Sequence, residues 1–441
     1  MSLKWLHIAW VTAQSYVYHY PLFMSYLWMM GAAVFYLRFE RDDPPFNEPR
    51  KLADPPPVSV LIPCFNEGPH VEETVRYALA LDYPDFEVIA IDDGSRDDTG
   101  AILDALVPKH PRLRVVHLAR NQGKALALRA GALLARHEIL ICIDGDALLD
   151  PHSAHWLVRH FVENADIAAV TGNPRIRNRT TLLGRVQVGE FSSIVGMIKR
   201  AQRTFGALFT VSGVITAFRK SAVHQVGYWS PDMLTEDIDI TWMLQRSGWD
   251  VRFEPRALVW ILMPETLRGL WKQRLRWATG GAQVLRKNVS VILSPTQNHL
   301  WPLLLEALLS FVWSYLMLAV VVWWLLGLVL PAHTLPVTHS PLIPNYGSAL
   351  LGGTCMLQFA FSKWLDSHYD RGLGRNYFWM IWYPLVFWLI TTAATVVGYP
   401  KAYRLGTGQR ARWTSPDRGA HLKADRRKPK KKAKAEETGH G

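Results

Sequence analysis

The sequence has 441 residues but only three cysteines, and charged residues make up only 20% of it. Three cysteines without paired spacing exclude a small disulfide-stapled protein. Cys64, Cys142 and Cys355 are therefore expected to be small buried residues. A hydrophobic fraction of 49% also excludes an intrinsically disordered chain. The length leaves room for a catalytic domain together with a second part.

Charged side chains are absent from three long stretches, Trp5–Leu37, Ala307–Ser362 and Asn376–Pro400. A bilayer core of ~30 Å is crossed by roughly 20 apolar residues in a helix. A large soluble protein can bury such helices, but it seldom needs so long an uncharged run, so we expect an integral membrane protein. The sequence predicts membrane spans at Pro21–Leu37, Leu303–Leu330 and Tyr346–Phe361, the last two joined by a loop at Pro331–Asn345. It also predicts a weak span or interfacial helix at Trp5–Tyr20. The segment Trp379–Thr395, which is interrupted by Pro384, is predicted to be re-entrant or to lie in the interface.

The formal net charge of +12 is concentrated at one end of the chain. Residues 401–441 hold 13 Lys and Arg against 4 Asp and Glu, which places this tail in the cytoplasm by the positive-inside rule. No DNA- or RNA-binding fold is recognisable, so nucleic acid is not an expected partner. We expect a membrane segment at 1–40, a cytoplasmic domain with interfacial helices at 41–299, a transmembrane block at 300–400 and a basic cytoplasmic tail at 401–441.

The charged middle of the chain alternates short apolar runs with helical patterns. Its strand-like runs are too continuously apolar to have a solvated face, which is typical of a parallel sheet covered on both sides. The order predicts an α/β fold, a doubly wound and mostly parallel sheet with its ligand at the carboxyl ends of the strands. The predicted strands are Val58–Pro63, Glu87–Ile91, Arg114–Leu118 and Ile139–Ile143, and the predicted helices are Val71–Leu81, Thr99–Val107 and Lys124–Ala135.

Polar residues follow several of these strands. Asp144-Gly145-Asp146 comes after the fourth predicted strand and could hold a hard divalent cation, although such a pair is also common in solvated turns. Asp93, after the second strand, could accept hydrogen bonds from a nucleoside or could cap the next helix. Lys124 begins a predicted helix after a glycine turn and suits a phosphate, but it could equally belong to a simple helix start.

Two later motifs carry further candidate groups. Thr235-Glu236-Asp237 precedes an amphipathic helix, where Asp237 could act as a general base or merely favour the helix N-terminus. Gln273-Arg274-Leu275-Arg276-Trp277 places two guanidinium groups and an indole on one helix. Arg can bind departing phosphates and Trp can stack on a sugar, although a juxtamembrane basic helix has the same composition.

Taken in order, Asp93, Asp144-x-Asp146, Thr235-Glu-Asp237 and Gln273-Arg-x-Arg-Trp277 resemble the signature of processive family 2 glycosyltransferases. This family includes the synthases of cellulose, chitin, hyaluronan and poly-N-acetylglucosamine. Longer stretches between about Pro21 and Gly419 are similar to the branch that makes the β-1,6-linked polymer. They are Val170–Arg177, Val211–Val214, Trp260–Thr266, Arg410–Trp413 and Ser415–Gly419.

The resemblance implies a GT-A nucleotide-diphospho-sugar transferase fold with UDP-N-acetylglucosamine as donor. Asp93 would hold the uridine, Lys124 would face the phosphates, and Asp144 and Asp146 would bind the diphosphate through Mg²⁺ or Mn²⁺, Asp146 more directly. Asp237 would deprotonate the acceptor hydroxyl. Gln273, Arg274 and Arg276 would stabilise the departing UDP, while Glu236 and Trp277 would hold the acceptor.

The resemblance also implies a multi-pass protein of the bacterial inner membrane that exports a biofilm exopolysaccharide. It further implies a small membrane partner subunit and activation by cyclic di-GMP. Two alternatives stay open: a synthase of a chitin-, hyaluronan- or cellulose-like polymer, because the catalytic signature does not encode the linkage, and a transporter or scaffold whose domain only binds nucleotides.

The segment Arg175–Arg203 contains seven Lys and Arg but one acidic residue. Such a composition is typical of a basic amphipathic helix on an anionic membrane surface, which is the interpretation we favour. Binding of the polymer or of cyclic di-GMP is the alternative.

Overall fold

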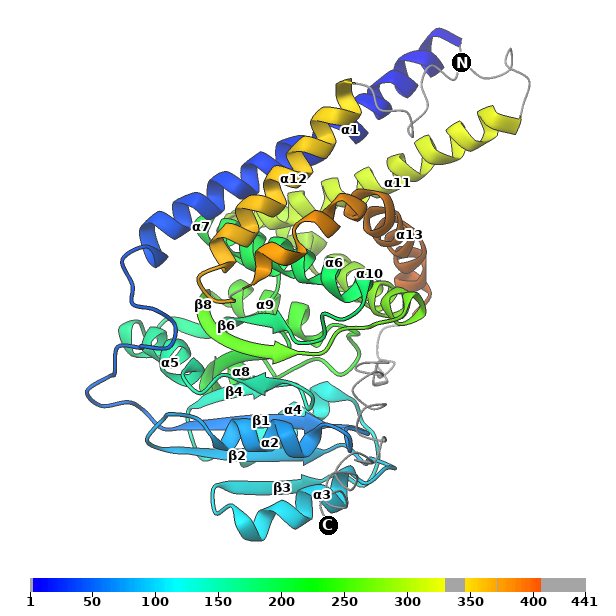
Figure 1. Cartoon of the computed structure of the whole chain (residues 1–441). Coiled ribbons are helices and arrows are strands. Elements are labelled where there is room, and N and C mark those ends of the chain that lie inside the picture. Colours follow the sequence, from blue (N-terminus) through cyan, green and yellow to red (C-terminus); the bar gives the residue numbers. More distant parts are fainter. Residues whose placement is uncertain (1–2, 330–345, 371, 406–441) are drawn as a thin grey trace, which may run out of the picture.

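The computed structural model describes residues 3–329, 346–370 and 372–405. The predicted loop Pro331–Asn345 and the tail beyond residue 405, with the stretches Arg410–Trp413 and Ser415–Gly419, lie outside the described residues. The described chain consists of an α/β domain and a group of long helices that extend from one side of it (Figure 1).

One mixed sheet of eight strands forms the centre of the α/β domain, in the order β3-β2-β1-β4-β7-β6-β8-β5. The first four strands pair in parallel, whereas β7 is antiparallel to both of its neighbours and β5 is antiparallel to β8. The strands are β1 (Val58–Cys64), β2 (Phe86–Asp92), β3 (Leu113–His117), β4 (Ile139–Ile143), β5 (Leu148–Leu149), β6 (Ile167–Ile176), β7 (Ile215–Arg219) and β8 (Asp250–Ile261).

The four predicted strands all form, and their bounds lie within one residue of the prediction. Every residue of β1, β2 and β4 is buried, because helices cover both faces of this part of the sheet. The α/β fold class is therefore confirmed. The sequence predicted no strand after Ile143, so the antiparallel pairing of β7, which makes the sheet mixed, is new information.

Helices α2, α3 and α5 pack on one face of the sheet, and α4, α8 and α9 pack on the other. The three predicted helices form, each ending one or two residues earlier than expected. The helices of the domain are α2 (Val71–Leu79), α3 (Thr99–Leu106), α4 (Lys124–Leu134), α5 (Ser153–Glu163), α6 (Leu182–Phe191), α7 (Lys199–Thr204), α8 (Lys220–Gln225), α9 (Glu236–Arg246) and α10 (Leu267–Asn288), with a π-helical turn η3 (Ser192–Ile198) between α6 and α7.

The N-terminal apolar stretch forms one helix, α1 (Leu3–Phe35), that continues through Pro21. The predicted division into Trp5–Tyr20 and Pro21–Leu37 was wrong. Pro21 has no N–H to offer the carbonyl of Val17, and an unpaired carbonyl would favour a break. The indole N–H of Trp313 donates to that carbonyl instead, at 2.9 Å. A side chain of a neighbouring helix thus supplies the hydrogen bond that the Val17 carbonyl cannot receive from Pro21. The 33 residues of α1 therefore form one helix about 50 Å long.

Among the described residues, two helical segments are long and apolar enough to cross a membrane, His7–Glu40 and Pro295–Gly327. The first contains most of α1 and the second most of α11 (Trp301–Val329), in agreement with two of the predicted spans. A third helix, α12 (Tyr346–Asp366), forms where another span was predicted and packs against α1. Its position relative to a membrane stays a prediction.

The last apolar segment forms α13 (Tyr383–Arg404), preceded by a short 3₁₀ helix, η7 (Phe378–Trp382). The proline expected to interrupt this segment lies in the first turn of α13, where a missing N–H costs nothing. α13 packs along α10, and the approach is close at Gly398, where a Cβ atom would lie 2.9 Å from the Cβ of Ala278. The last apolar helix therefore contacts the helix that carries the Gln273–Trp277 motif.

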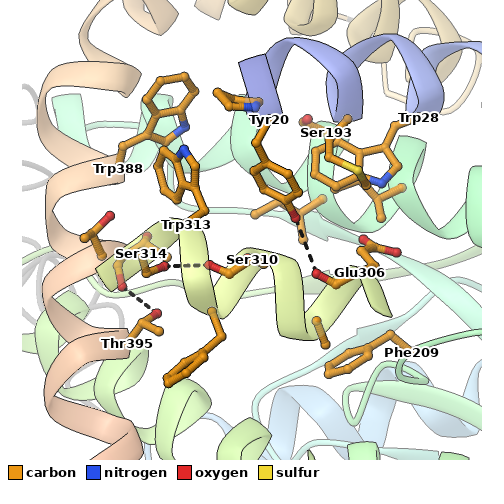
Figure 2. A pocket seen from close by; sticks show the side chains of 18 of the residues that line it. Tyr20, Trp28, Ser193, Phe209, Glu306, Ser310, Trp313, Ser314, Trp388 and Thr395 are labelled. Carbon is orange, nitrogen blue, oxygen red and sulfur yellow. Dashed lines mark hydrogen bonds between the residues drawn. The ribbon is translucent and has the colours of Figure 1, made fainter. Parts of the chain in front are cut away.

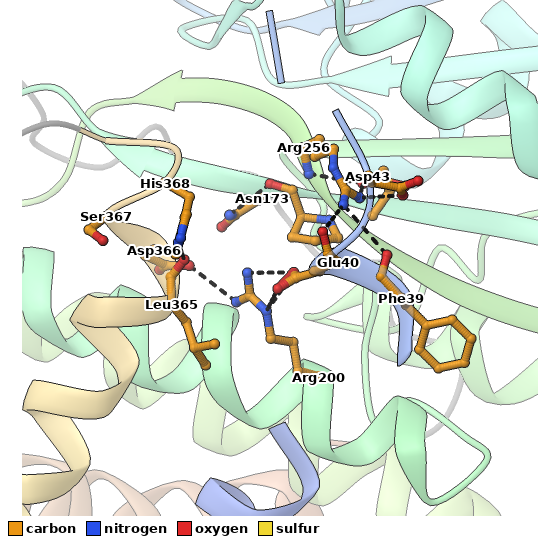
Figure 3. A network of polar contacts seen from close by, with 12 residues as sticks. Phe39, Glu40, Asp43, Asn173, Arg200, Arg256, Leu365, Asp366, Ser367 and His368 are labelled. Carbon is orange, nitrogen blue, oxygen red and sulfur yellow. Dashed lines mark hydrogen bonds and ion pairs between the residues drawn. The ribbon is translucent and has the colours of Figure 1, made fainter. Parts of the chain in front are cut away.

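Buried ion pairs join the long helices to the α/β domain (Figure 3). Glu40, in the π-helical turn η1 (Tyr36–Glu40) that follows α1, pairs with Arg200 of α7 at 2.8 Å. Arg200 also pairs with Asp366, the last residue of α12, at 3.1 Å, and Asp366 pairs with Arg175 of β6 at 2.6 Å. All four side chains are buried. This cluster, which we call the Glu40–Arg200–Asp366–Arg175 network, fixes the ends of two long helices against the domain.

The network corrects the interpretation of Arg175–Arg203 as a basic surface for a membrane. Arg175, Lys199 and Arg200 are buried, and the two arginines are neutralised by carboxylates from distant parts of the chain. The more exposed Arg177, Arg179 and Arg203 pair with Glu73, Asp370 and Asp250. The sequence shows one acidic residue in the segment because the others come from elsewhere in the fold.

We predict that Asp366→Asn lowers the free energy of unfolding by about 3–5 kcal/mol, because Arg175 and Arg200 would stay buried with too little negative charge. Thermal and denaturant unfolding of the purified protein in detergent would measure this change. Asp42→Asn is the matched control, because Asp42 and Arg41 are both exposed and their ion pair is long, at 3.8 Å. This substitution should change the free energy of unfolding by less than about 1 kcal/mol. Equal effects of the two substitutions would contradict the prediction.

Candidate active site

The carboxyl ends of β1, β2 and β4 meet at one edge of the sheet and bring acidic side chains together. Asp93 directly follows β2, and Asp144 and Asp146 follow β4; all three are buried. Burial, and then the negative charges of Glu67, Asp92, Asp144 and Asp146, raise the pKa of the Cys64 thiol at the end of β1 well above its usual range. Several carboxylates therefore surround one point at this edge, where ligands of open α/β sheets bind.

Asp93 shapes the loop that leads into α4. Its Oδ1 accepts a hydrogen bond from the backbone N–H of Gln122, and its Oδ2 accepts one from Gly123, both at 2.8 Å. Gly123 has φ of +94°, a left-handed conformation that favours glycine. Burial raises the pKa of Asp93, while the two N–H groups oppose that rise. Asp93 thus fixes the backbone before Lys124, a role that the sequence did not predict.

Lys124 connects the two predicted carboxylate motifs. Its Nζ lies 2.6 Å from Asp144 Oδ1 and 3.1 Å from Glu236 Oε1, and it donates to the carbonyl of Gly213 at 3.0 Å. Burial opposes the positive charge, but Asp144, Glu236 and Asp237 outweigh it and raise the pKa of Lys124 above its ordinary value. Lys124 is therefore a fixed cation between the end of β4 and the start of α9.

Asp237 lies in the first turn of α9 and is partly buried. Its Oδ1 accepts from the N–H of Ile238 at 2.9 Å and its Oδ2 from the N–H of Gly213 at 3.3 Å. Burial and then the charge of Glu236 raise the pKa of Asp237, while Lys124 and Arg276 lower it. A carboxylate with a raised pKa is a better proton acceptor than an ordinary aspartate, which suits a general base.

The turn at Ser212–Gly213 is a part of the site to which the sequence assigned no role. A Cβ atom at Gly213 would lie 3.0 Å from Asp237 Oδ2 and 3.1 Å from Lys124 Nζ, so the backbone passes directly against both groups. The Val211–Val214 stretch had suggested the family resemblance, but nothing in its composition points to Asp237 or Lys124. Only the folding of β7 beside β4 brings the turn to them.

The residues of the Gln273–Trp277 motif on helix α10 lie in two different surroundings. It approaches Thr235 closely, since a Cβ at Gly280 would lie 2.3 Å from Thr235 Oγ1. Arg276 is exposed, and its charge acts on Asp237, so it lies on the side of the carboxylates. Arg274 is buried, donates to Glu190 Oε2 at 2.5 Å and stacks over Trp277 at 4.4 Å. Of these two arginines, the structure therefore brings Arg276 toward Asp237 and places Arg274 beside Glu190 and Trp277.

Gln273 is also buried, and its Oε1 has no hydrogen-bond partner in the described part of the chain. An unsatisfied buried amide oxygen is costly, and its presence next to a candidate site suits a ligand that donates a hydrogen bond.

A cavity of about 450 Å³ lies between α10 and the long helices. Glu190 and Arg274 line it together with residues of α1, α11, α12 and α13. Figure 2 shows Tyr20, Trp313 and Trp388 on one side of it, near the hydroxyls of Ser310, Ser314 and Thr395. Aromatic faces next to scattered hydroxyl groups are the surface that a sugar chain requires, since its rings are apolar on their faces and polar at their rims.

The candidate metal residues fit a cation that a bound phosphate completes. Asp144 and Asp146 are buried at the strand end, and oxygen ligands of this kind suit Mg²⁺ and Mn²⁺. Among the residues that the structure covers, no group of three His, Cys, Asp or Glu side chains is placed to hold a metal ion. Asp144 and Asp146 could supply two carboxylate ligands, which would leave coordination positions for substrate oxygens and water.

Comparisons with known proteins agree with this geometry. Residues 55–280 match the family model described as Glycosyltransferase like family 2. The poly-beta-1,6-N-acetyl-D-glucosamine synthase of Staphylococcus epidermidis is 37% identical over 412 residues, covering 92% of this chain and 98% of the relative. The synthase of the same name from Staphylococcus aureus is 36% identical, with the same coverage.

A solved structure has the same fold. The mannosyltransferase PcManGT from Pyrobaculum calidifontis, in complex with GDP-Man and Mn²⁺, superposes with a TM-score of 0.57 at 19% identity. The match covers 88% of this chain and 99% of the mannosyltransferase. It confirms the predicted GT-A fold.

We predict that Gly213→Ala destabilises the protein by about 1–3 kcal/mol, because the added methyl group would press on Asp237 and Lys124 in a packed site. Gly281→Ala is the control, since nothing in the described structure lies within 4 Å of a Cβ there and alanine favours a helix. Thermal unfolding in detergent would compare the two variants. A stability of Gly213→Ala equal to or above that of Gly281→Ala would show that the turn does not contact the two side chains as described.

Proposed function

The chain belongs to the family 2 glycosyltransferases, and from this premise we propose that it polymerises N-acetylglucosamine from UDP-N-acetylglucosamine into β-1,6-linked poly-N-acetylglucosamine. The observation that carries the choice of polymer is the extent of the similarity to the staphylococcal synthases, which runs through the catalytic domain and the long helices alike. A shared catalytic domain alone would support only sugar transfer.

On the donor side, the proposal assigns UDP to the carboxyl edge of the sheet. Asp93, which holds the loop before α4, binds the uridine in this proposal, and Lys124, which pairs with Asp144, faces the phosphates. Gln273 and Arg276 of α10 bind the departing UDP, and the buried Oε1 of Gln273 is free to accept a hydrogen bond from it. Fixed cations and donors aimed at a departing diphosphate are usually the largest contribution to catalysis of this kind.

We propose Asp144 and Asp146 as the residues that hold Mg²⁺ or Mn²⁺, with Asp146 the more direct ligand because Asp144 also pairs with Lys124. A divalent cation at this place would neutralise negative charge on the diphosphate.

On the acceptor side, Asp237 takes the proton from the 6-hydroxyl of the growing chain. The hydroxyl oxygen forms a bond to C1 of the donor sugar as the bond from C1 to the UDP oxygen breaks. Attack from the opposite side converts the α-linked donor into a β-linked product. Glu236 and Trp277 hold the acceptor end, and Arg274, stacked on Trp277 beside the cavity, supports that surface.

The membrane arrangement is part of the same proposal. Residues 1–40 and 300–400 form membrane parts, while the domain at 41–299 and the tail at 401–441 lie in the cytoplasm of a bacterial cell. In this proposal, the cavity lined by Arg274 receives the chain as it leaves the site and passes it between the helices. A small membrane subunit and cyclic di-GMP belong to the proposal through family resemblance alone.

Product analysis tests the proposed polymer. Purified protein in nanodiscs, given labelled UDP-N-acetylglucosamine and Mg²⁺ with or without cyclic di-GMP, should form a polymer that a β-1,6-specific glycosidase degrades. Removal of the metal by a chelator should abolish the label in the polymer, and Mg²⁺ or Mn²⁺ should restore it. A polymer that resists this enzyme but yields to a chitinase, cellulase or hyaluronidase would contradict the assignment.

We predict that Asp237→Asn loses polymer synthesis by about 10²-fold or more, because the amide cannot accept the acceptor proton. Binding of UDP, measured by calorimetry, should stay within about threefold of the wild-type value, since Asp237 acts on the acceptor. Asp239→Asn is unsuitable as a control because Asp239 pairs with Lys287. Asp232→Asn, at a half-buried position before the same helix, should retain full activity. Normal synthesis by Asp237→Asn would end the assignment of the base.

A further inference from the structure

Lys199 is a buried lysine of the Arg175–Arg203 segment that belongs to none of the candidate catalytic motifs. It is the first residue of α7, and its side chain is only 5% exposed. Its Nζ donates to the hydroxyl of Ser212 at 2.7 Å. Ser212 is the first residue of the turn that passes against the candidate base.

The Ser212–Gly213 turn holds both sides of the active site. The N–H of Gly213 donates to Asp237 Oδ2 at 3.3 Å, and its carbonyl accepts from Lys124 Nζ at 3.0 Å. The N–H of Ser212 donates to Thr171 Oγ1 at 2.7 Å. A displacement of this turn would therefore act mainly on the longer hydrogen bond to Asp237, because Lys124 is also held by its ion pairs with Asp144 and Glu236.

The helix that carries Lys199 is itself fixed on its other side. The next residue, Arg200, is buried in the Glu40–Arg200–Asp366–Arg175 network (Figure 3). Ala201 packs against Gly31 of α1, where a Cβ would lie 2.9 Å from the Ala201 Cβ. Thr204 donates to the carbonyl of Gly31 at 2.9 Å. The side chain of Lys199 therefore extends to the Ser212–Gly213 turn from a helix that is held in place by contacts with α1 and α12.

A lysine in this place is energetically unfavourable as a packing residue. Burial lowers the pKa of Lys199 to about 7, although the charge of Asp237 acts in the opposite direction. A neutral hydroxyl compensates a buried ammonium poorly, and an apolar side chain of the same length would fill the space at a lower cost. The presence of the Lys199 amine at this position therefore points to a role at the Ser212–Gly213 turn.

We propose that Lys199 is a positioning residue for glycosyl transfer: by holding Ser212 it keeps the N–H of Gly213 on Asp237 and so aims the base at the acceptor hydroxyl. The inference rests on the proposed role of Asp237 as the base. It also makes α7 the physical connection between the long helices and the reacting groups.

The test is Lys199→Met in full-length protein in nanodiscs, assayed with UDP-N-acetylglucosamine and Mg²⁺. We expect kcat to fall by about 10- to 100-fold, the loss typical of a misplaced catalytic group, while KM for the donor and the Kd of UDP change by less than about threefold. Ser212→Ala should produce a similar fall. The double variant should be no slower than the slower single variant, because both remove the same hydrogen bond. Lys220→Met is the control. The Lys220 side chain lies at the end of β7 away from the Ser212–Gly213 turn and donates to the carbonyl of Ala135 at 2.7 Å, so this variant should keep wild-type kcat.

Wild-type kcat in folded Lys199→Met would overturn the inference, and so would parallel losses of kcat and UDP affinity, which indicate general damage. Strictly additive losses in the double variant would overturn it as well. If Lys199→Met does not fold, Ser212→Ala alone decides by the same split between kcat and KM. A wild-type protein that makes no polymer would overturn the proposed function and this inference with it, whereas a fully active Lys199→Met overturns this inference alone.

Discussion

Buried charges have to be paired, and this constraint determines how the long helices meet the α/β domain. Arg200 has no access to water, and in the described part of the chain its ion pairs are with Glu40 and Asp366, which end two helical segments far apart in the sequence. The helices can therefore occupy only positions that keep both carboxylates within reach of one guanidinium group. This arrangement brings α7 into close contact with α1. It also places the Lys199 amine within hydrogen-bond distance of Ser212.

The same rule organises the catalytic edge of the sheet. Asp144 and Glu236 belong to different halves of the domain, and Lys124 is the cation between them. This pairing holds the first turn of α9 beside the end of β4, so the proposed base Asp237 and the residues proposed for the donor lie around one cation. In the proposed function, a negatively charged diphosphate would compete with Asp144 and Glu236 for Lys124. Donor binding would then be coupled electrostatically to the surroundings of Asp237.

The sequence predicted the parts of the molecule whose signals are local. Strands β1 to β4 could be predicted from their apolar runs, and the carboxylates could be predicted because β2 and β4 are followed directly by Asp93 and Asp144. The second half of the sheet could not, since β6 and β8 include polar and charged residues that only distant partners satisfy, as Asp366 does for Arg175. The surroundings of Arg274 and the role of Gly213 were missed for a related reason: a glycine that touches two side chains carries no signal except through the fold.

The continuity of α1 through Pro21 has a consequence for the proposed membrane arrangement. A rod of about 50 Å exceeds a hydrocarbon layer of ~30 Å, and such hydrophobic mismatch is relieved chiefly by tilt. The end of α1 next to the α/β domain is held by the ion pair of Glu40 with Arg200, so a change of tilt would rotate α1 about Arg200. In that arrangement the thickness of the bilayer would act on α7, and membranes of different acyl-chain length would change the strain at the Ser212–Gly213 turn.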